Sequence, residues 1–112
     1  MKCNVLSTSP FERKLKALKK KYKSLISDLE PVIKELESTP RLGEFIGFDC
    51  FKIRVAITSK GKGKRGGARL ITLVKINRNN VYLLDIYDKS SQESISIQEL
   101  KFLIALLGQD PQ

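Results

Sequence analysis

The chain has 112 residues, of which 41% are hydrophobic and 29% are charged, so length and composition predict a single globular domain spanning residues 1–112. It carries 21 lysines and arginines against 12 acidic residues, which gives a formal net charge of +9, and it has no histidine. The lack of histidine excludes catalytic triads built on a histidine base and histidine-containing zinc sites, and no apolar run approaches the roughly 18 residues of a membrane span.

The N-terminal part is predicted to form a strand and a helical hairpin. Residues 2–7 are typical of a short strand. An apolar helix face follows, made of Phe11, Leu15, Leu18 and Tyr22, with Ser9 as the predicted cap and Pro10 at the first helical position. Apolar residues between positions 25 and 36 predict a second helix, which either begins near Ser27 or is kinked at Pro31. Residues 37–47 are predicted to be a loop.

Three strands are predicted next, joined by short connections into an antiparallel meander. Residues 51–58 alternate between two faces, with Lys52 and Arg54 on the outer one. Residues 59–67 form a loop, residues 70–76 are apolar on both faces like a central strand, and a turn at residues 78–80 leads to a strand over residues 81–87. Tyr82 and Tyr87 have opposite parity in that strand, so at most one should face the basic surface and stack on a base; core packing is the alternative for both.

Capping signals predict a helix at the C-terminal end. Ser96 and Glu99 form a capping box, Ile95 and Leu100 occupy hydrophobic-staple positions, and Gly108 is the stop signal. The predicted architecture is therefore α+β, with an N-terminal strand and helical hairpin packed on a small antiparallel β-sheet and a C-terminal helix.

The excess positive charge is concentrated in the middle of the chain. Residues 50–84 hold nine bases and no acids, whereas the remaining residues hold 12 of each. A local positive field of this kind favours a polyanionic partner, although a solvated lysine-rich surface is the alternative. In the glycine-rich loop four bases are candidate phosphate ligands, namely Lys60, Lys62, Lys64 and Arg65; a flexible, soluble hairpin tip is the alternative.

The same loop has the glycine spacing of a dinucleotide-binding motif at positions 61, 63 and 66. The following segment is strand-like rather than helical, and no acidic residue lies about 20 positions further on. The sequence therefore predicts no nucleotide or other small-molecule cofactor.

Arg69 is the most informative single base. It shares strand parity with Ile71 and Leu73, so its side chain is predicted to lie on a largely covered face, where a guanidinium requires an anionic partner. That partner is either an external anion or a structural carboxylate, Asp85 or Asp88.

The N-terminal residues and the cysteines predict a cytoplasmic protein with no membrane association. The start MKCNVLSTSP has no apolar stretch of the kind found in signal peptides. Cys3 and Cys50 are accordingly expected to be reduced thiols, with a disulfide between them as the alternative.

The order of these elements resembles the RelE/ParE superfamily of type II toxin–antitoxin toxins, and RelE-type mRNA interferases in particular. The resemblance begins at SPFERKLKALKKKY, continues through ESTPRLGEFIGFDCFKIRVAI and SKGKGKRGGARLITLVKI, and extends to VYLLDIYDKSSQESISIQELKFLI. It implies a small RNase-like fold, ribosome-dependent cleavage of mRNA without a metal or cofactor, and neutralisation by a cognate antitoxin protein.

The resemblance also implies the positions of the catalytic bases, which are Lys52, Arg54, Arg69 and Lys89. Clustered lysines and arginines can stabilise the charge that develops on a phosphate during RNA cleavage. Arg69 is expected to take that role, and Arg54 and Lys52 to hold the phosphate or transfer a proton. Because arginine keeps its proton, only Lys52 of these two can serve as a base.

The sequence departs from the family pattern at one position. RelE has a tyrosine near the start of its final helix, where this chain has Ile95, and Tyr87 is the nearest alternative. A ParE-like toxin that binds DNA gyrase, or a catalytically inactive RNA-binding protein, is therefore an alternative on the same fold. The basic residues on the strands favour the nuclease.

Overall fold

The computed structural model describes residues 2–61 and 63–108. In chain order its elements are β1 (Asn4–Ser7), α1 (Ser9–Lys21), α2 (Leu25–Ser38), β2 (Glu44–Gly47), β3 (Cys50–Val55), β4 (Ala68–Lys75), β5 (Asn80–Asp88) and α3 (Ile97–Leu107). Single 3-10 turns lie at Thr58–Lys60, Lys64–Gly66 and Ile76–Arg78. Within the described residues, no helix is long and apolar enough to cross a membrane.

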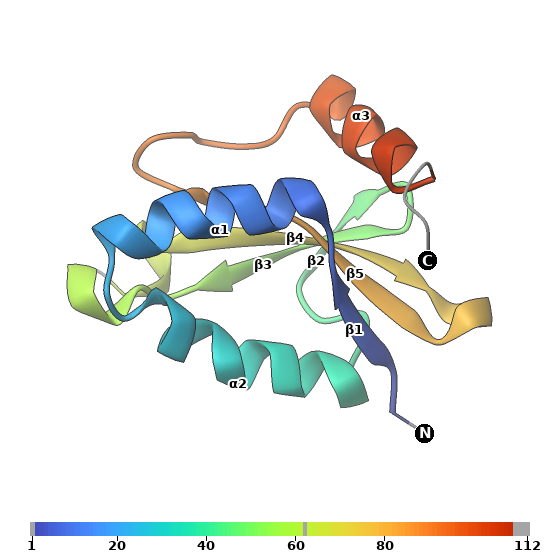
Figure 1. Cartoon of the computed structure of the whole chain (residues 1–112), viewed down its shortest axis with the longest axis horizontal. Helices are drawn as coiled ribbons and strands as arrows, with labels where there is room; N and C mark the ends of the chain where they lie inside the picture. Colours follow the sequence, from blue (N-terminus) through green and yellow to red (C-terminus); the bar gives the residue numbers. More distant parts are fainter. Residues whose placement is uncertain (1, 62, 109–112) are drawn as a thin grey trace.

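The strands form one sheet in the order β1-β5-β4-β3-β2. The predicted meander is confirmed, because β3, β4 and β5 pair antiparallel in succession, and β4 is the central strand (Figure 1). The sheet is mixed rather than wholly antiparallel, since β1 runs parallel to β5. The helical hairpin separates β1 from the meander, so no tight turn constrains its direction. The predicted α+β fold class is otherwise confirmed.

The helical hairpin differs from the prediction at its ends. Thr8, rather than Ser9, caps α1: its hydroxyl oxygen accepts from the Phe11 amide at 3.5 Å and donates to the Leu83 carbonyl of β5 at 2.8 Å. The cap therefore also fixes the start of α1 to the sheet. The second helix begins at Leu25 and includes Pro31 in its interior, so the alternative of a longer helix through Pro31 fits the structure and a start near Ser27 does not.

The segment predicted to be a loop at residues 37–47 contains regular structure at both ends. It begins within α2 and ends in β2, which pairs with β3 through a two-residue turn at Phe48 and Asp49. Both turn residues have positive φ, 54° and 62°, a conformation for which hairpins normally use asparagine or glycine. Because that signature is missing from the sequence, the hairpin was not predicted.

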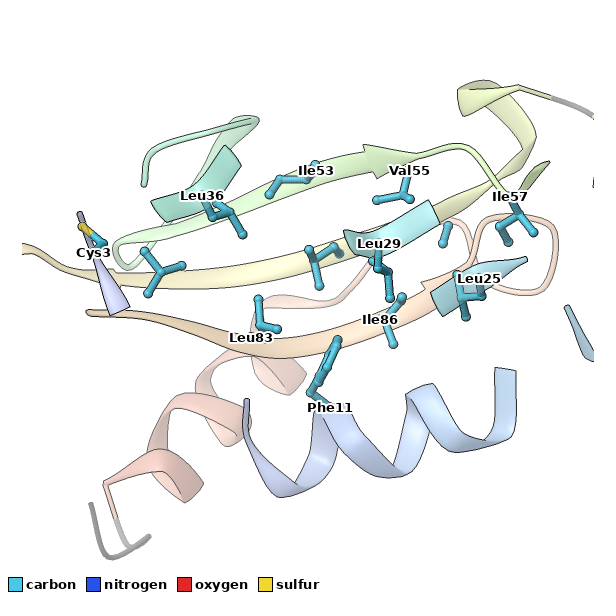
Figure 2. Packing of buried hydrophobic residues seen from close by; sticks show 13 residues of the cluster. Cys3, Phe11, Leu25, Leu29, Leu36, Ile53, Val55, Ile57, Leu83 and Ile86 are labelled. Atoms are coloured by element: carbon cyan, nitrogen blue, oxygen red, sulfur yellow. The ribbon is translucent and has the colours of Figure 1, made fainter. Parts of the chain in front are cut away.

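Two apolar clusters hold the sheet between the helices. On one face, side chains of α1 and α2 such as Phe11, Leu25 and Leu29 pack on Ile53 and Ile86 (Figure 2). On the opposite face, the α3 side chain Leu100 packs in a second cluster with residues of β3, β4 and β5. The apolar faces that the sequence predicted for the helices are therefore confirmed, because these faces form the core.

The two cysteines are buried free thiols, so the disulfide alternative is wrong. Cys3 lies in the first cluster and Cys50 in the second. Burial, with a smaller contribution from Asp49, raises the pKa of the Cys50 thiol to about 12.

Gly67 provides a test of the close approach between β3 and β4. A β-carbon at this position would lie 2.1 Å from the Val55 carbonyl oxygen, a backbone atom that cannot move aside without disturbing the strand. We expect Gly67→Ala to lower the free energy of unfolding by about 1–3 kcal/mol, the usual range for overpacking. Gly108→Ala is the matched control, because its β-carbon would meet only an ordinary contact at 3.5 Å. Equal melting temperatures for the two variants would contradict the expected clash.

Candidate functional site

Three of the predicted site residues form a row across the sheet. Arg54 of β3 is directly opposite Arg69 of β4, which is directly opposite Tyr87 of β5. Directly opposite side chains lie on the same face of a sheet, so the three are neighbours. Arg54 is exposed, whereas Arg69 and Tyr87 are only 4% and 3% exposed. The row therefore leads from solvent into the protein.

The guanidinium of Arg69 binds backbone carbonyls of the glycine-rich loop. Its Nη1 donates to the Lys64 carbonyl at 2.9 Å and to the Ala68 carbonyl at 3.2 Å, and its Nη2 donates to the Arg65 carbonyl at 3.3 Å. Burial, and secondly the neighbouring charge of Arg54, lowers the pKa of Arg69. The arginine is thus held in a fixed orientation by neutral acceptors.

The two carboxylates proposed as structural partners of Arg69 are bound to other bases. Asp85 lies 3.3 Å from the Lys14 ammonium of α1, and Asp88 lies 2.8 Å from the ammonium of Lys60. A salt bridge from Arg69 to Asp85 or Asp88 is therefore not part of the structure. The sequence did not reveal these pairings, since each joins residues at least 28 positions apart.

Lys60 lies inside the protein rather than among the exposed bases of the loop. Its ammonium donates to the Gly66 carbonyl at 2.8 Å, to Asp88 at 2.8 Å and to the Ser90 hydroxyl at 3.0 Å. Its side chain is only 10% exposed. We predicted Lys60 as a phosphate ligand, but in this arrangement its charge is directed to Asp88 and its contact with Gly66 closes the loop.

The carboxylate of Asp88 is the centre of this network. Tyr22 of α1 donates its hydroxyl to Oδ2, while the amide and hydroxyl of Ser90 donate to Oδ1. Burial alone would raise the pKa of Asp88, but the hydrogen bonds from Lys60, Tyr22 and Ser90 outweigh it and hold that pKa well below its usual range. The hydrogen bond to Asp88 is also the main cause that raises the pKa of Lys60. Both groups, the Asp88 carboxylate and the Lys60 ammonium, are therefore ionised at neutral pH.

The other bases predicted around the site differ in their exposure. Lys64 and Arg65 are exposed, and Lys62 lies outside the described residues. Lys89 is half-buried: its ammonium donates to the Glu93 carbonyl at 3.2 Å, and its amide donates to the Gly67 carbonyl at 3.0 Å. Lys52 is 23% exposed and lies 3.6 Å from Glu44. Arg54, Lys64 and Arg65 thus present their charge to solvent most fully.

Tyr82 and Tyr87 lie on the same face of β5, which contradicts the opposite-parity prediction. A bulge is the reason, because Ile71 pairs with Asp85 while the next residue of β4 pairs with Leu83, leaving Leu84 as an extra residue on β5. The hydroxyl of Tyr87 is buried without a hydrogen-bond partner. Burial is the main cause that raises the pKa of Tyr87, so its phenol stays protonated at neutral pH.

Asp85 belongs to a polar cluster that the sequence analysis missed as a functional group. It is 1% exposed, and one of its oxygens has no hydrogen-bond partner. Lys14 links it to Glu99 of α3, at a distance of 3.9 Å from that carboxylate. Burial raises the pKa of Asp85. The cluster joins α1, β5 and α3, and it is close enough to the row that, after burial, the charges of Asp85 and Glu99 also raise the pKa of Tyr87.

A groove of about 710 Å³ opens beside the row, between α2 and β3. Its charged lining includes Lys52, Arg54 and Lys64 from the basic side and Asp28 and Glu35 from α2. Among the side chains of residues 2–61 and 63–108, no group of three cysteines or carboxylates is placed to hold a metal ion. The row and its basic neighbours therefore offer guanidinium, ammonium and phenol groups, and the α2 side of the groove adds carboxylates.

The fold matches solved structures of bacterial toxins. A free double arginine-to-alanine mutant of the E. coli toxin RelE superposes with a TM-score of 0.59 at 21% identity, covering 83% of this chain and 90% of that one. The chain has the fold of the RelE toxins. Isolated E. coli RelE gives a TM-score of 0.56 at 18% identity over 93% of this chain and 98% of that one.

A third match is the toxin–antitoxin complex RelBE2 of Mycobacterium tuberculosis, with a TM-score of 0.54 at 16% identity over 79% of this chain and 92% of that one. No protein-family model matches the sequence. At these identities the likeness to RelE concerns the fold, and the activity has to be argued from the site.

Proposed function

We propose that this protein is the toxin of a toxin–antitoxin system and that it cleaves mRNA at the ribosome with a metal-free basic site. The observation that carries the proposal is the row of Arg54, Arg69 and Tyr87 on a RelE-like sheet, beside an exposed basic loop. Such a row offers charge stabilisation and a protonated hydroxyl within one small area. Those are two of the three functions that RNA cleavage through the 2′-hydroxyl requires.

Each residue of the row has a distinct role in this proposal. Arg69 is held in place by its carbonyl partners and stabilises the negative charge that the scissile phosphate gains. Arg54 is exposed and contacts the incoming phosphate first. Tyr87 keeps its proton at neutral pH and is the candidate donor to the leaving oxygen. Lys52 is the candidate base, and Lys89 flanks the phosphate site.

The proposed partners are mRNA, the ribosome and a cognate antitoxin. The antitoxin is supported by the likeness to RelBE2, which is a toxin–antitoxin complex. The groove between α2 and β3 contains Lys52, Arg54 and Lys64, so a protein segment seated there would cover part of the candidate site.

One observation favours the alternative, a gyrase-binding or inactive toxin. By the resemblance to RelE, Ile95 stands where that family has its tyrosine, and in the structure it packs against the cluster that contains Leu100. A phenol hydroxyl is therefore absent from the start of the final helix, and Tyr87 must supply it for the nuclease to work.

Primer extension on mRNA after expression of the chain tests the proposal. Discrete new 5′ ends within translated messages are expected, and they should disappear with Arg54→Ala combined with Arg69→Ala. A gyrase supercoiling assay on the purified protein is the companion measurement. Inhibited supercoiling with intact mRNA would establish the alternative and overturn the nuclease.

RNA affinity is expected to fall steeply with salt. If about five phosphates are neutralised, the slope of log K against log salt concentration should be roughly −4. The exposed and half-buried bases around the site are sufficient in number: Lys52, Arg54, Lys64, Arg65 and Lys89. A fluorescence titration with a short RNA between about 50 and 200 mM salt checks the slope. A flat response would contradict the polyanion interpretation.

A further inference from the structure

The solvent-facing side of α1 carries a second concentration of positive charge, outside the candidate site. Residues 9–23 contain eight charged side chains, of which seven are bases and only Glu12 is acidic. Three of these bases follow helical spacing of three and four residues within α1, and a fourth lies in the turn after the helix ends at Lys21; all four are exposed: Arg13, Lys16, Lys20 and Lys23. We call these four residues the basic ridge.

The basic ridge runs along the outside of the helix. The opposite side of α1 is occupied by Phe11, Leu15, Leu18 and Tyr22, which pack into the core. Arg13 and Lys20 are seven residues apart, so at about 1.5 Å per residue the helical part of the ridge extends for about 10 Å, and Lys23 follows in the turn after the helix. Bases three or four positions apart on a helix have β-carbons about 5–6 Å apart, which makes Arg13, Lys16 and Lys20 a continuous row of positive charge.

The ridge bases within α1 repel one another, although Lys20, in the last turn, also interacts favourably with the helix dipole. Like charges at these spacings repel and destabilise a helix, whereas an acidic residue among them would stabilise it. None of the four ridge bases forms an ion pair within residues 2–61 and 63–108. The lone acid of the helix, Glu12, accepts a hydrogen bond from Ser7. The ridge is therefore an uncompensated positive surface, which an external polyanion would neutralise.

The surface chemistry favours nucleic acid over protein and membrane. Lysine is depleted from protein–protein interfaces, which are anchored by aromatic and apolar side chains, whereas nucleic-acid interfaces are strongly positive. Membrane-surface helices insert their apolar face into the lipid, but the apolar face of α1 is already buried against the sheet. The ridge offers charge alone, and charge alone is sufficient for binding phosphates.

The shape of the ridge favours a duplex over a single strand. Single strands are bound in grooves where bases stack on aromatic rings, and the exposed residues of α1 include no aromatic side chain. Double-stranded RNA is recognised mostly through its phosphates and shape. The end of the ridge is also close to the glycine-rich loop, because Ser24 donates to the Ser59 hydroxyl at 2.9 Å and the Lys60 ammonium lies 5.3 Å from the Tyr22 ring (Figure 1).

We propose that the basic ridge binds the phosphate backbone of a nucleic-acid duplex, as a docking surface separate from the row of Arg54, Arg69 and Tyr87. A duplex held there lies next to the loop that adjoins the candidate site. The proposal does not depend on the nuclease: it requires binding and no reaction.

The test compares two variants that lose the same charge. The ridge variant combines Lys16→Gln, Lys20→Gln and Lys23→Gln, and glutamine keeps the helix propensity close to that of lysine. The control variant combines Lys34→Gln, Arg41→Gln and Lys101→Gln, three exposed bases outside both the ridge and the candidate site. Both variants should melt near the wild-type temperature, and circular dichroism checks that α1 is intact.

The binding probes are a blunt RNA duplex, a DNA duplex of the same sequence, and vesicles containing anionic lipid. We expect the ridge variant to bind the RNA duplex at least about tenfold more weakly than the control at 0.1 M salt. Its slope of log K against log salt should be shallower by about 2, because up to three phosphate contacts are lost. Weakening with both duplexes assigns generic duplex binding, and weakening with RNA alone assigns A-form RNA.

The remaining outcomes overturn the proposal. An equal loss in the ridge and control variants would mean that only net charge matters. An unchanged duplex affinity, or a loss confined to the vesicles, would mean that the ridge does not bind nucleic acid. Cleavage of mRNA is measured separately. If the protein binds duplexes through the ridge but does not cleave mRNA, the nuclease proposal is wrong and the ridge proposal stands.

Discussion

Arg69→Ala is expected to lower the single-turnover rate of mRNA cleavage by about 10²–10³-fold, the typical effect of removing one pre-organised donor from a charge-stabilising site. The fold should survive, since Ala68 and Leu70 on either side of Arg69 are fully buried and unchanged. Of the three carbonyls that lose this donor, those of Lys64 and Arg65 belong to exposed residues whose backbone water can reach once the guanidinium is gone, whereas that of Ala68 belongs to a buried residue of β4. We therefore expect a stability loss of only about 1–3 kcal/mol.

Two further variants sharpen this prediction. Arg69→Lys should recover only part of the rate, because an ammonium cannot reproduce the planar, multi-donor grip of a guanidinium. Arg41→Ala removes an exposed arginine outside the site and should leave the rate unchanged. An Arg69→Ala protein that is folded and fully active, or one that fails to fold, would overturn the catalytic assignment.

The contacts of Arg69 also suggest how substrate and loop compete. The guanidinium donates to two loop carbonyls, the same kind of acceptor atom that a phosphate oxygen provides. A phosphate carries negative charge and is the stronger acceptor for an arginine. When a substrate phosphate binds Arg69, it would therefore replace the loop carbonyls as the acceptor. The loop backbone has to move for this exchange to occur.

The fold was largely predictable because its elements follow local rules. Helical spacing identified the buried face of α1, alternation placed Ile53 and Arg54 on opposite faces of β3, and the capping box located the start of α3, where Ser96 accepts from the Glu99 amide at 3.1 Å. The prediction failed where the backbone departs from a local rule. The hairpin at Phe48 and Asp49 uses positive φ without the usual residues.

The candidate site was less predictable, because it depends on long-range contacts. One extra residue, Leu84, places Tyr82 and Tyr87 on the same face, and a bulge has no signature in this stretch of sequence. Lys60 and Lys64 are both glycine-loop lysines in the sequence, yet one is buried against Asp88 and the other is exposed. Only the three-dimensional position of Asp88 and Tyr22 distinguishes them.

Asp88→Asn is expected to destabilise the protein by about 3–5 kcal/mol, because it leaves the Lys60 ammonium buried without its counter-charge. The asparagine amide keeps the volume of the side chain but cannot balance a positive charge 2.8 Å away. For a chain of this size the expected fall in melting temperature is on the order of 10–20 °C. Lys60→Ala should also destabilise, whereas Lys64→Ala, at an exposed position of the same loop, should not.

The acid dependence of stability supplies a second measurement of the same network. The folded state lowers the pKa of Asp88, so its contribution to stability is complete above the unfolded value of about 4 and is lost as pH falls below it. Urea unfolding of the wild type between about pH 6 and pH 2 should therefore show a fall in the free energy of unfolding that Asp88→Asn largely removes. Asp49→Asn, at an exposed aspartate, is the matched control and should show the same fall in the free energy of unfolding at low pH as the wild type. The assignment of Asp88 as the anchor of the loop would be wrong if Asp88→Asn and Asp49→Asn had the same stability and the same pH profile.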